Sequence, residues 1–331
     1  MADASPIDMS RVEEATRILS GHFPRTRLIR AAGASPQRGD VFLKLESELP
    51  TGSFKVRGAL YALAVNMRRR RIREVVASST GNHGAAVAYA AKSHHVGATI
   101  FLPRNPNPVK ARTIAELGAR IEEQGADLAE ACDLAIRYAE RTGAYCMQDT
   151  VDPDIPIGAG TVAVEILSEL PDAQTIVVPV GDSALIRGVA AVAKQLRPGI
   201  RIVGVQAERA PSYYLSWQKG SVVTTSSADT IADGLATRRP VAANVAAIRE
   251  LVDDMRLVTD EAMLHAMNRL LFDDHLVAEP AGAAALAACI AETDRSGSGK
   301  TVVIVSGGNV APDVLRRTLS MGSNIQATHE G

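Results

Sequence analysis

Lys55 is an amine placed where its charge is disfavoured. It lies in the segment SFKVRGA (residues 53–59), between a glycine-containing turn and an Ala/Leu-rich stretch that predicts a helix. The start of a helix is the positive end of its dipole, so losing the ammonium charge there costs less. The neutral amine is the form that makes a Schiff base with an aldehyde. Taken alone, Lys55 fits better as an ordinary surface lysine, and three other segments change this interpretation.

A loop of hydroxyl and amide side chains, SSTGNHG (residues 78–84), lies between a predicted strand and a predicted helix. These side chains and the exposed N–H groups can bind a carboxylate or an oxyanion at the helix N-terminus. Ser, Thr and Asn are also the preferred N-cap residues, so the pattern leaves anion binding and helix capping equally open. For His83, a hydrogen-bonded structural role is favoured over a role as a ligand.

Two further turns follow β-branched runs. The segment GDSAL (residues 181–185) follows a run at 175–178, and its backbone N–H groups can surround a phosphate. Asp182 would repel that phosphate unless its side chain turns away, for example to cap the following helix. The segment SGGN (residues 306–309) follows a run at 302–305. Its glycines permit close approach of the backbone to a flat ligand, and Ser306 can hydrogen-bond a ring nitrogen.

The elements that position these residues alternate between strand and helix patterns. Strands are predicted at 41–45, 75–78, 99–102, 175–178, 201–205 and 302–305, and helices at 55–66, 82–94, 108–117, 129–141 and before Leu196. This alternation predicts an α/β fold whose parallel sheets are covered by helices on both faces. Ligands of such sheets bind beyond the C-terminal ends of the strands, where three of the four segments lie.

In this order, the four segments resemble those of the fold-type II pyridoxal-phosphate enzymes, in particular the threonine/serine dehydratase and serine racemase family. The resemblance covers nearly the whole chain, because other segments look like family landmarks in the right sequence: GAGT (158–161), GVQ (204–206), ADGLA (232–236) and EPAGAA (279–284). It implies a tryptophan synthase β-like fold of two lobes, each an open, mostly parallel sheet flanked by helices.

The resemblance also implies a domain division. Residues 1–60 and 148–331 would form a large cofactor-binding domain. Residues 61–147 would form a smaller, mobile domain that carries the substrate loop from Ser79 to His83. Most relatives are dimers, so a homodimer is expected.

Individual roles follow from the same resemblance. Lys55 matches the lysine that attaches pyridoxal 5'-phosphate and then accepts the substrate α-proton, and Thr80 is the second expected catalytic residue. Asn82 matches the residue that hydrogen-bonds the ring 3-oxygen, and Ser306 matches the serine facing the pyridine nitrogen. Cofactor contacts are expected from Phe54, Lys55, Asn82, Gly181, Asp182, Ser183, Ala184, Leu185, Gly234, Glu279 and Ser306. Substrate contacts are expected from Ser79, Thr80, Asn82 and His83.

The implied activity is that of a pyridoxal-phosphate-dependent ammonia-lyase. It would dehydrate and deaminate a 3-hydroxy amino acid, threonine or serine by default, to a 2-oxo acid and ammonia. A hydroxyl such as that of Ser306 leaves the pyridine nitrogen largely unprotonated, which favours prompt loss of a β-leaving group. Three alternatives stay open: a specialised dehydratase (for hydroxyectoine breakdown, hydroxyaspartate or phenylserine), an amino-acid racemase, and a degenerate binding protein without chemistry.

Four departures from the family pattern qualify these expectations. The phosphate loop is often four glycines, whereas here it is GDSA (residues 181–184), in which the Ser183 hydroxyl could add a phosphate contact. Thr80 stands where racemases carry a serine, which favours dehydration. Gln206 and Ser212 stand where divalent-metal members carry acidic residues, so no divalent metal site is expected. The chain ends soon after residue 309, which suggests an enzyme without a C-terminal regulatory domain.

Bulk properties exclude several other classes. The formal charge of −1 gives no electrostatic case for nucleic acid or an anionic membrane. The 3 cysteines show neither zinc spacing nor a disulfide framework. Neither a signal peptide nor an apolar run long enough to span a membrane is visible, so a cytoplasmic location is expected. A small amino acid is the expected partner.

Overall fold

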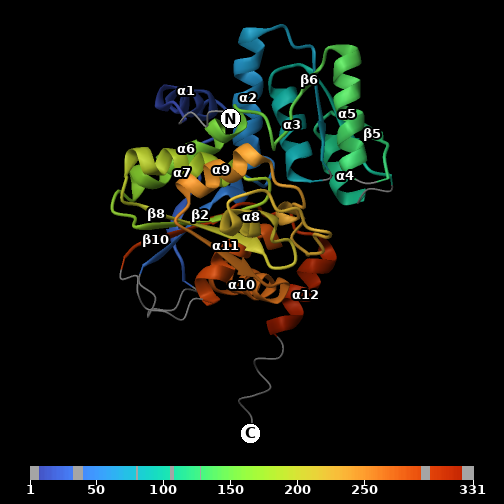
Figure 1. Cartoon of the computed structure of the whole chain (residues 1–331). Coiled ribbons are helices and arrows are strands. Elements are labelled where there is room, and N and C mark those ends of the chain that lie inside the picture. The colour runs from blue at the N-terminus through green and yellow to red at the C-terminus, as the bar shows by residue number, and fades with distance from the viewer. Residues whose placement is uncertain are drawn as a thin grey trace.

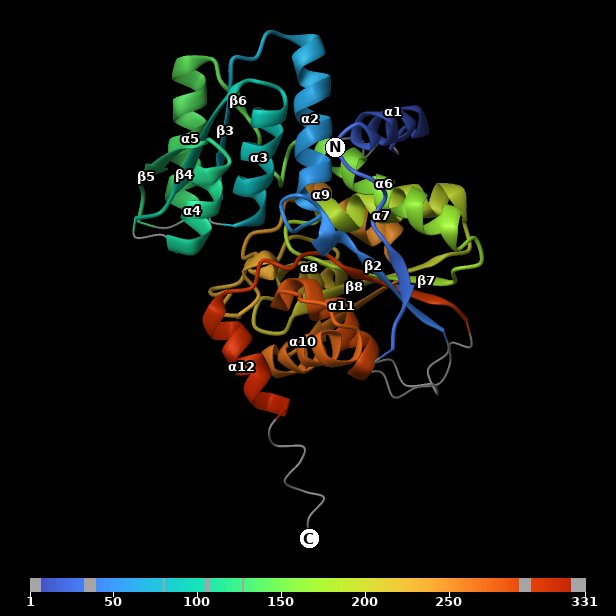
Figure 2. The same ribbon diagram turned by 180° about the vertical axis from the view of Figure 1, so that it is seen from behind.

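The structure is a computed structural model that describes residues 7–32, 40–79, 81–104, 108–126, 128–291 and 299–322. Its strands form one six-stranded sheet, in the order β1-β2-β10-β7-β8-β9, and one four-stranded sheet, in the order β5-β4-β3-β6. Each sheet is the centre of one lobe, and the smaller lobe stands above the larger one in Figures 1 and 2. The expected two-lobe α/β fold is confirmed.

The larger sheet is parallel except at one edge. Its strands are β1 (Leu28–Arg30), β2 (Val41–Leu45), β7 (Thr175–Pro179), β8 (Arg201–Ala207), β9 (Asp254–Val258) and β10 (Thr301–Val305). Only β1 runs antiparallel to its neighbour within the described sheet. A three-residue strand is too short to show a hydrophobic period, which is why the sequence pattern did not predict it.

Alternate residues of the large sheet enter two different cores. Ile176 and Val178 pack with α6 (Ile155–Glu169) and α7 (Ala184–Leu196), whereas Val177 packs with α10 (Asp260–Asp273) and α11 (Pro280–Ala291). This follows from the period of two along a strand. Figure 1 shows α6, α7 and α9 (Ala242–Leu251) on one face, and α10, α11 and α12 (Pro312–Gly322) on the other. The remaining helices of this lobe are α1 (Met9–Ser20) and α8 (Ser212–Lys219).

The smaller sheet is parallel throughout its described strands, β3 (Glu74–Ser78), β4 (Gly97–Leu102), β5 (Arg120–Glu123) and β6 (Tyr145–Cys146). One face packs against α2 (Lys55–Arg69) and α3 (Asn82–Ser93), and the other against α5 (Leu128–Thr142). The fourth helix is α4 (Pro108–Glu116). All four strands lie within the predicted smaller domain, but its first boundary, between residues 60 and 61, falls inside α2. The domain division therefore stays a prediction.

The apolar residues of the strands and helices are buried in the hydrophobic cores of the two lobes. Among the described residues, no helix is long and apolar enough to cross a lipid bilayer.

Candidate active site

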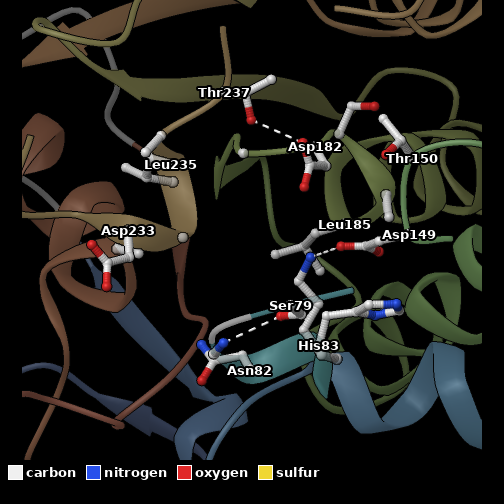
Figure 3. A pocket seen from close by; sticks show the side chains of 18 of the residues that line it. Ser79, Asn82, His83, Asp149, Thr150, Asp182, Leu185, Asp233, Leu235 and Thr237 are labelled. Carbon is white, nitrogen blue, oxygen red and sulfur yellow. Dashed lines mark hydrogen bonds and ion pairs between the residues drawn. The ribbon is translucent and has the colours of Figure 1, made fainter. Parts of the chain in front are cut away.

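A cavity of about 630 Å³ lies between the lobes, beyond the C-terminal ends of β3, β7 and β10. Every predicted site residue that the structure describes lines it: Phe54, Lys55, Ser79, Asn82, His83, Gly181, Asp182, Ser183, Ala184, Leu185, Gly234, Glu279 and Ser306. These residues come from segments more than 200 positions apart in the chain. Figure 3 shows Asn82, Asp149 and Asp182 around this one cavity. Thr80 lies outside the described residues.

Lys55 begins α2, and its side chain is only 14% exposed. Burial lowers the pKa of its ammonium, while the carboxylates of Asp182 and Glu279 oppose that shift. The positive end of the α2 dipole acts in the same direction as burial. Lys55 therefore loses its proton more readily than an exposed lysine does, as its position in the sequence suggests.

Asp149 belongs to no motif noted in the sequence, yet it contacts the lysine. It lies in the connection between β6 and α6, and its Oδ2 forms an ion pair with Lys55 Nζ, drawn as a dashed line in Figure 3. Its side chain is 7% exposed. The other oxygen, Oδ1, is buried and has no hydrogen-bond partner among the residues that the structure describes. Asp149 thus adds an acidic group to the wall that holds the lysine.

The N-terminus of α3 opens into the cavity. It begins directly after Gly81, and within the described chain no side chain caps it. Ser79 Oγ instead accepts a hydrogen bond of 3.2 Å from the Gly81 N–H. Free N–H groups at a helix start bind anions, so this end of α3 can receive a carboxylate. The capping interpretation of the loop is not supported for its described residues.

His83, on the first turn of α3, is held by the protein. Its Nε2 lies 3.0 Å from the Met147 carbonyl oxygen, so Nε2 carries the proton in the neutral ring. Burial, followed by the charge of Lys55, lowers its pKa to about 4. The ring is therefore neutral at pH 7. The hydrogen bond expected of a structural histidine is present, while the role of His83 and its contact with substrate stay predictions.

Asn82 joins the two lobes across the cavity. Its Nδ2 donates to Glu279 Oε1 at 2.6 Å, and its Oδ1 accepts from Asn309 Nδ2 at 2.8 Å. Asn309 Nδ2 also donates to the carbonyl oxygen of Thr51 at 2.8 Å. Two expected cofactor residues, Asn82 and Glu279, are thus in direct contact, and Asn82 keeps one N–H of its amide for a ligand.

The predicted phosphate loop leads into α7 and packs tightly on a second loop. A Cβ added to Gly181 would lie 2.0 Å from the carbonyl oxygen of Gly234, so no larger residue fits without a shift. Ser183 is the residue before α7, has a left-handed φ of 75°, and makes no capping hydrogen bond within the described structure. The first N–H groups of α7 therefore remain available to an anion.

The polar side chains of this loop have partners within the protein. The Oδ1 of Asp182 accepts a hydrogen bond of 2.9 Å from Thr237 Oγ1 (Figure 3). Capping of α7 was one way in which this side chain could turn away, and in the described structure its partner is instead a residue of another loop. Ser183 Oγ accepts from Arg187 Nε at 3.2 Å. The Arg187 guanidinium is thus in contact with the loop through Ser183.

Ser306 directly follows β10 and is buried. Its carbonyl oxygen accepts a hydrogen bond of 3.1 Å from the Phe54 N–H, which fixes the start of α2 against the large sheet. An isolated bridge between Ser53 and Gly307 extends this pairing. The lysine segment and the SGGN segment are therefore one structural unit, although they lie at opposite ends of the sequence.

No group of three or more His, Cys, Asp or Glu side chains that could hold a metal is present in the described part of the chain. Gln206 Oε1 accepts from the Tyr214 N–H at 3.0 Å, and Ser212 Oγ donates to the Thr237 carbonyl at 2.5 Å. Both positions make protein contacts, and the absence of a divalent site stays a prediction.

Comparison with known proteins agrees with this fold and this cavity. A model of the family "Pyridoxal-phosphate dependent enzyme" matches residues 19–308. L-threonine ammonia-lyase of Thermotoga maritima is 36% identical over 317 residues, which cover 96% of this chain and 79% of that protein. Catabolic L-threonine dehydratase of Escherichia coli is 31% identical over 308 residues, 92% of this chain and 94% of its own. The structure of maize serine racemase matches with a TM-score of 0.88 and 32% identity, covering 98% of this chain and 99% of that one.

The fold and the cavity thus define an α/β enzyme with a buried lysine in a cavity between two lobes. The chain belongs to the family of pyridoxal-phosphate dependent enzymes.

The residues of the cavity fit that cofactor. A buried lysine with a lowered pKa suits an aldehyde, and the uncapped start of α7 suits a phosphate. The volume of about 630 Å³ lies within the range of small-molecule sites and has room for an amino acid as well.

Proposed function

We propose that this protein is a pyridoxal-phosphate-dependent ammonia-lyase that converts a 3-hydroxy amino acid to a 2-oxo acid and ammonia. Threonine or serine is the default substrate. One observation carries the proposal: the buried Lys55 amine shares a cavity with two uncapped helix N-termini, those of α3 and α7. This arrangement provides a base and two anion sites, which an amino acid and a phosphate-bearing cofactor together require.

Each part of the cavity then has a separate task. The bound cofactor withdraws electrons from the α-carbon of the amino acid and makes its α-proton acidic. The start of α7 and residues 181–185 hold the phosphate, while Asn82 and Ser306 contact the ring. The start of α3 and Ser79 bind the substrate carboxylate. Lys55, as a neutral amine, takes the α-proton, and loss of the β-hydroxyl follows.

The relatives support the same reaction. The Thermotoga maritima protein is described as a threonine ammonia-lyase and the Escherichia coli protein as a threonine dehydratase. Both match almost the whole of this chain. The hypothesis of a degenerate binding protein was motivated by Asp182, and the hydrogen bond from Thr237 to that carboxylate gives it a place within the protein.

A product assay tests the proposal. The cofactor-loaded enzyme is incubated with threonine, serine, 3-hydroxyaspartate and phenylserine, and the 2-oxo acid and ammonia are measured. We expect turnover of threonine or serine with one ammonia per 2-oxo acid. Absence of turnover of all four hydroxy amino acids by enzyme with bound cofactor would refute the simple dehydratase proposal. Preference for hydroxyaspartate or phenylserine would identify the specialised form.

Racemisation is the second candidate, because the fold and 32% of residues match a serine racemase. Chiral analysis of the remaining serine separates the two activities. A racemase would bring the enantiomer ratio towards one, whereas a dehydratase alone consumes serine without producing its mirror image.

A further inference from the structure

Arg187, on the first turns of α7, is a partly buried cation without an acidic partner. Its Nη2 is buried and has no hydrogen-bond partner among the described residues. Burial lowers the pKa of its guanidinium, and no carboxylate of the described chain opposes that shift. By contrast, the fully buried Arg57 forms ion pairs with Glu46 and Glu165. A cation held away from water without a counter-charge lowers stability until an anion binds beside it.

The guanidinium of Arg187 lies beside the start of α7. Side chains of a helix lean towards its N-terminus, and Arg187 Nε accordingly donates at 3.2 Å to Oγ of Ser183, the residue before α7. Ser183 lines the cavity, whereas Arg187 stands behind it. The positive end of a helix dipole disfavours a cation, so burial and the dipole both act against this charge in the absence of an anion.

The groups around Ser183 do not balance the charge of Arg187. Ser183 Oγ donates to Tyr213 Oη at 3.4 Å, and Asn244 Nδ2 donates to the same oxygen at 3.3 Å. These neighbours are hydroxyl and amide groups. The carboxylate of Asp182 accepts its hydrogen bond from Thr237 and is not among the groups that shift the pKa of Arg187. The counter-charge of Arg187 is therefore left to a ligand.

From this geometry, and resting on the prediction made with the proposed function that residues 181–185 hold the cofactor phosphate, we propose that Arg187 is a positioning residue that supplies the positive charge of the phosphate site. Its Nε occupies one lone pair of Ser183 Oγ, which leaves the Ser183 hydrogen free to turn from Tyr213 to a phosphate oxygen. A hydrogen bond from a charged donor also makes this hydroxyl a stronger donor. This role is the same whichever amino acid the enzyme converts.

The same contact accounts for a side chain at a position that favours glycine. Ser183 has a left-handed φ of 75°, a conformation that glycine adopts without strain. A glycine there would give Arg187 Nε no partner in the loop. The Ser183 hydroxyl therefore connects the charge behind the loop with the cavity in front of it.

Two ligands that differ only in the phosphate test this role. Arg187→Met keeps much of the side-chain volume and removes the charge. The enzyme freed of cofactor is titrated with pyridoxal 5'-phosphate and, separately, with pyridoxal. We expect the dissociation constant to rise at least about tenfold for pyridoxal 5'-phosphate and to stay within about threefold for pyridoxal. Without cofactor, Arg187→Met should melt at least about 1 °C above the wild type, because an unbalanced charge has been removed.

The matched control is Arg249→Met, which removes an exposed arginine from α9 and should leave both dissociation constants within about twofold. An equal loss of affinity for the two ligands in Arg187→Met would indicate general damage and overturn the inference. A lower melting temperature of the cofactor-free variant would also overturn it. If Arg187→Met does not fold, Arg187→Gln takes its place under the same criteria. Failure of both to fold would show that the cofactor-free protein needs the charge, which contradicts the proposed role.

The outcome is separable from that of the function proposed above, because neither titration requires turnover. Unchanged affinity for pyridoxal 5'-phosphate in Arg187→Met, with a loss in Gly181→Ala, would overturn the role of Arg187 and leave the phosphate loop standing. Unchanged affinity in both variants would count against the loop itself and overturn the role of Arg187 with it.

Discussion

At the scale of residues, burial sets the charge states of the cavity. The same low-dielectric wall lowers the pKa of Lys55 and of His83, because each would have to carry a positive charge away from water. The charge of Lys55 is partly compensated by carboxylates. For His83, burial and the charge of Lys55 outweigh the hydrogen bond to the Met147 carbonyl, which by itself raises the pKa. The neutral histidine therefore leaves Lys55 as the cation that interacts with Asp149.

The lowered pKa of His83 predicts a loss of stability in acid. The value of about 4 lies below the ordinary 6.5, so the unfolded chain takes up the proton first as the pH falls. Stability is lost between those two values, by about 2 kcal/mol from pH 7 to pH 5. Urea unfolding at both pH values measures it. His83→Gln, which can still donate to the Met147 carbonyl, is the control and should lose about 2 kcal/mol less; equal losses would contradict the prediction.

At the scale of elements, close backbone contacts define the predicted phosphate loop. Gly181 touches the loop that contains Gly234, and the glycine is required by this approach rather than by its φ angle. Ser183, in contrast, adopts the left-handed conformation despite its Cβ. A loop poorer in glycine than expected can therefore still start α7 with free N–H groups.

Gly181→Ala tests whether that close contact matters for the cofactor. The added Cβ forces the two loops apart, so we expect pyridoxal-phosphate affinity to fall by about tenfold and stability by about 1–3 kcal/mol. Gly199→Ala is the matched control, because its Cβ would meet no described atom within 4 Å. Equilibrium titration with the cofactor and thermal unfolding provide the two measurements. An unchanged affinity of Gly181→Ala for pyridoxal phosphate would contradict the prediction that this loop binds the phosphate.

At the scale of the whole molecule, the site is assembled from both lobes. The smaller sheet supplies the start of α3, and the larger sheet supplies the starts of α2 and α7 and the end of β10. Asn82 links them through Glu279 and Asn309. We propose that the smaller lobe moves when this link opens. The homodimer also remains a proposal.

Much of this arrangement could be predicted from the sequence. The β-branched runs at 175–178 and 302–305 became β7 and β10, because parallel strands buried on both faces need apolar residues at every position. The polar or glycine-rich segments at 78–84, 181–185 and 306–309 each follow a strand. The parallel topology alone therefore predicts that they lie near the C-terminal ends of the strands. Side-chain partners could not be predicted. Asp149 stands in a short connection without a motif, and Thr237, which engages Asp182, lies 55 positions from it.

The central claim is that Lys55 attaches the cofactor, and labelling tests it most directly. The cofactor-loaded enzyme is reduced with borohydride, digested, and analysed by mass spectrometry for the lysine that carries the pyridoxyl group. Lys44, which is buried in an ion pair with Glu165, is the internal comparison. The account predicts the label on Lys55 and its loss in Lys55→Ala. A label on any other lysine of the wild-type protein would contradict it.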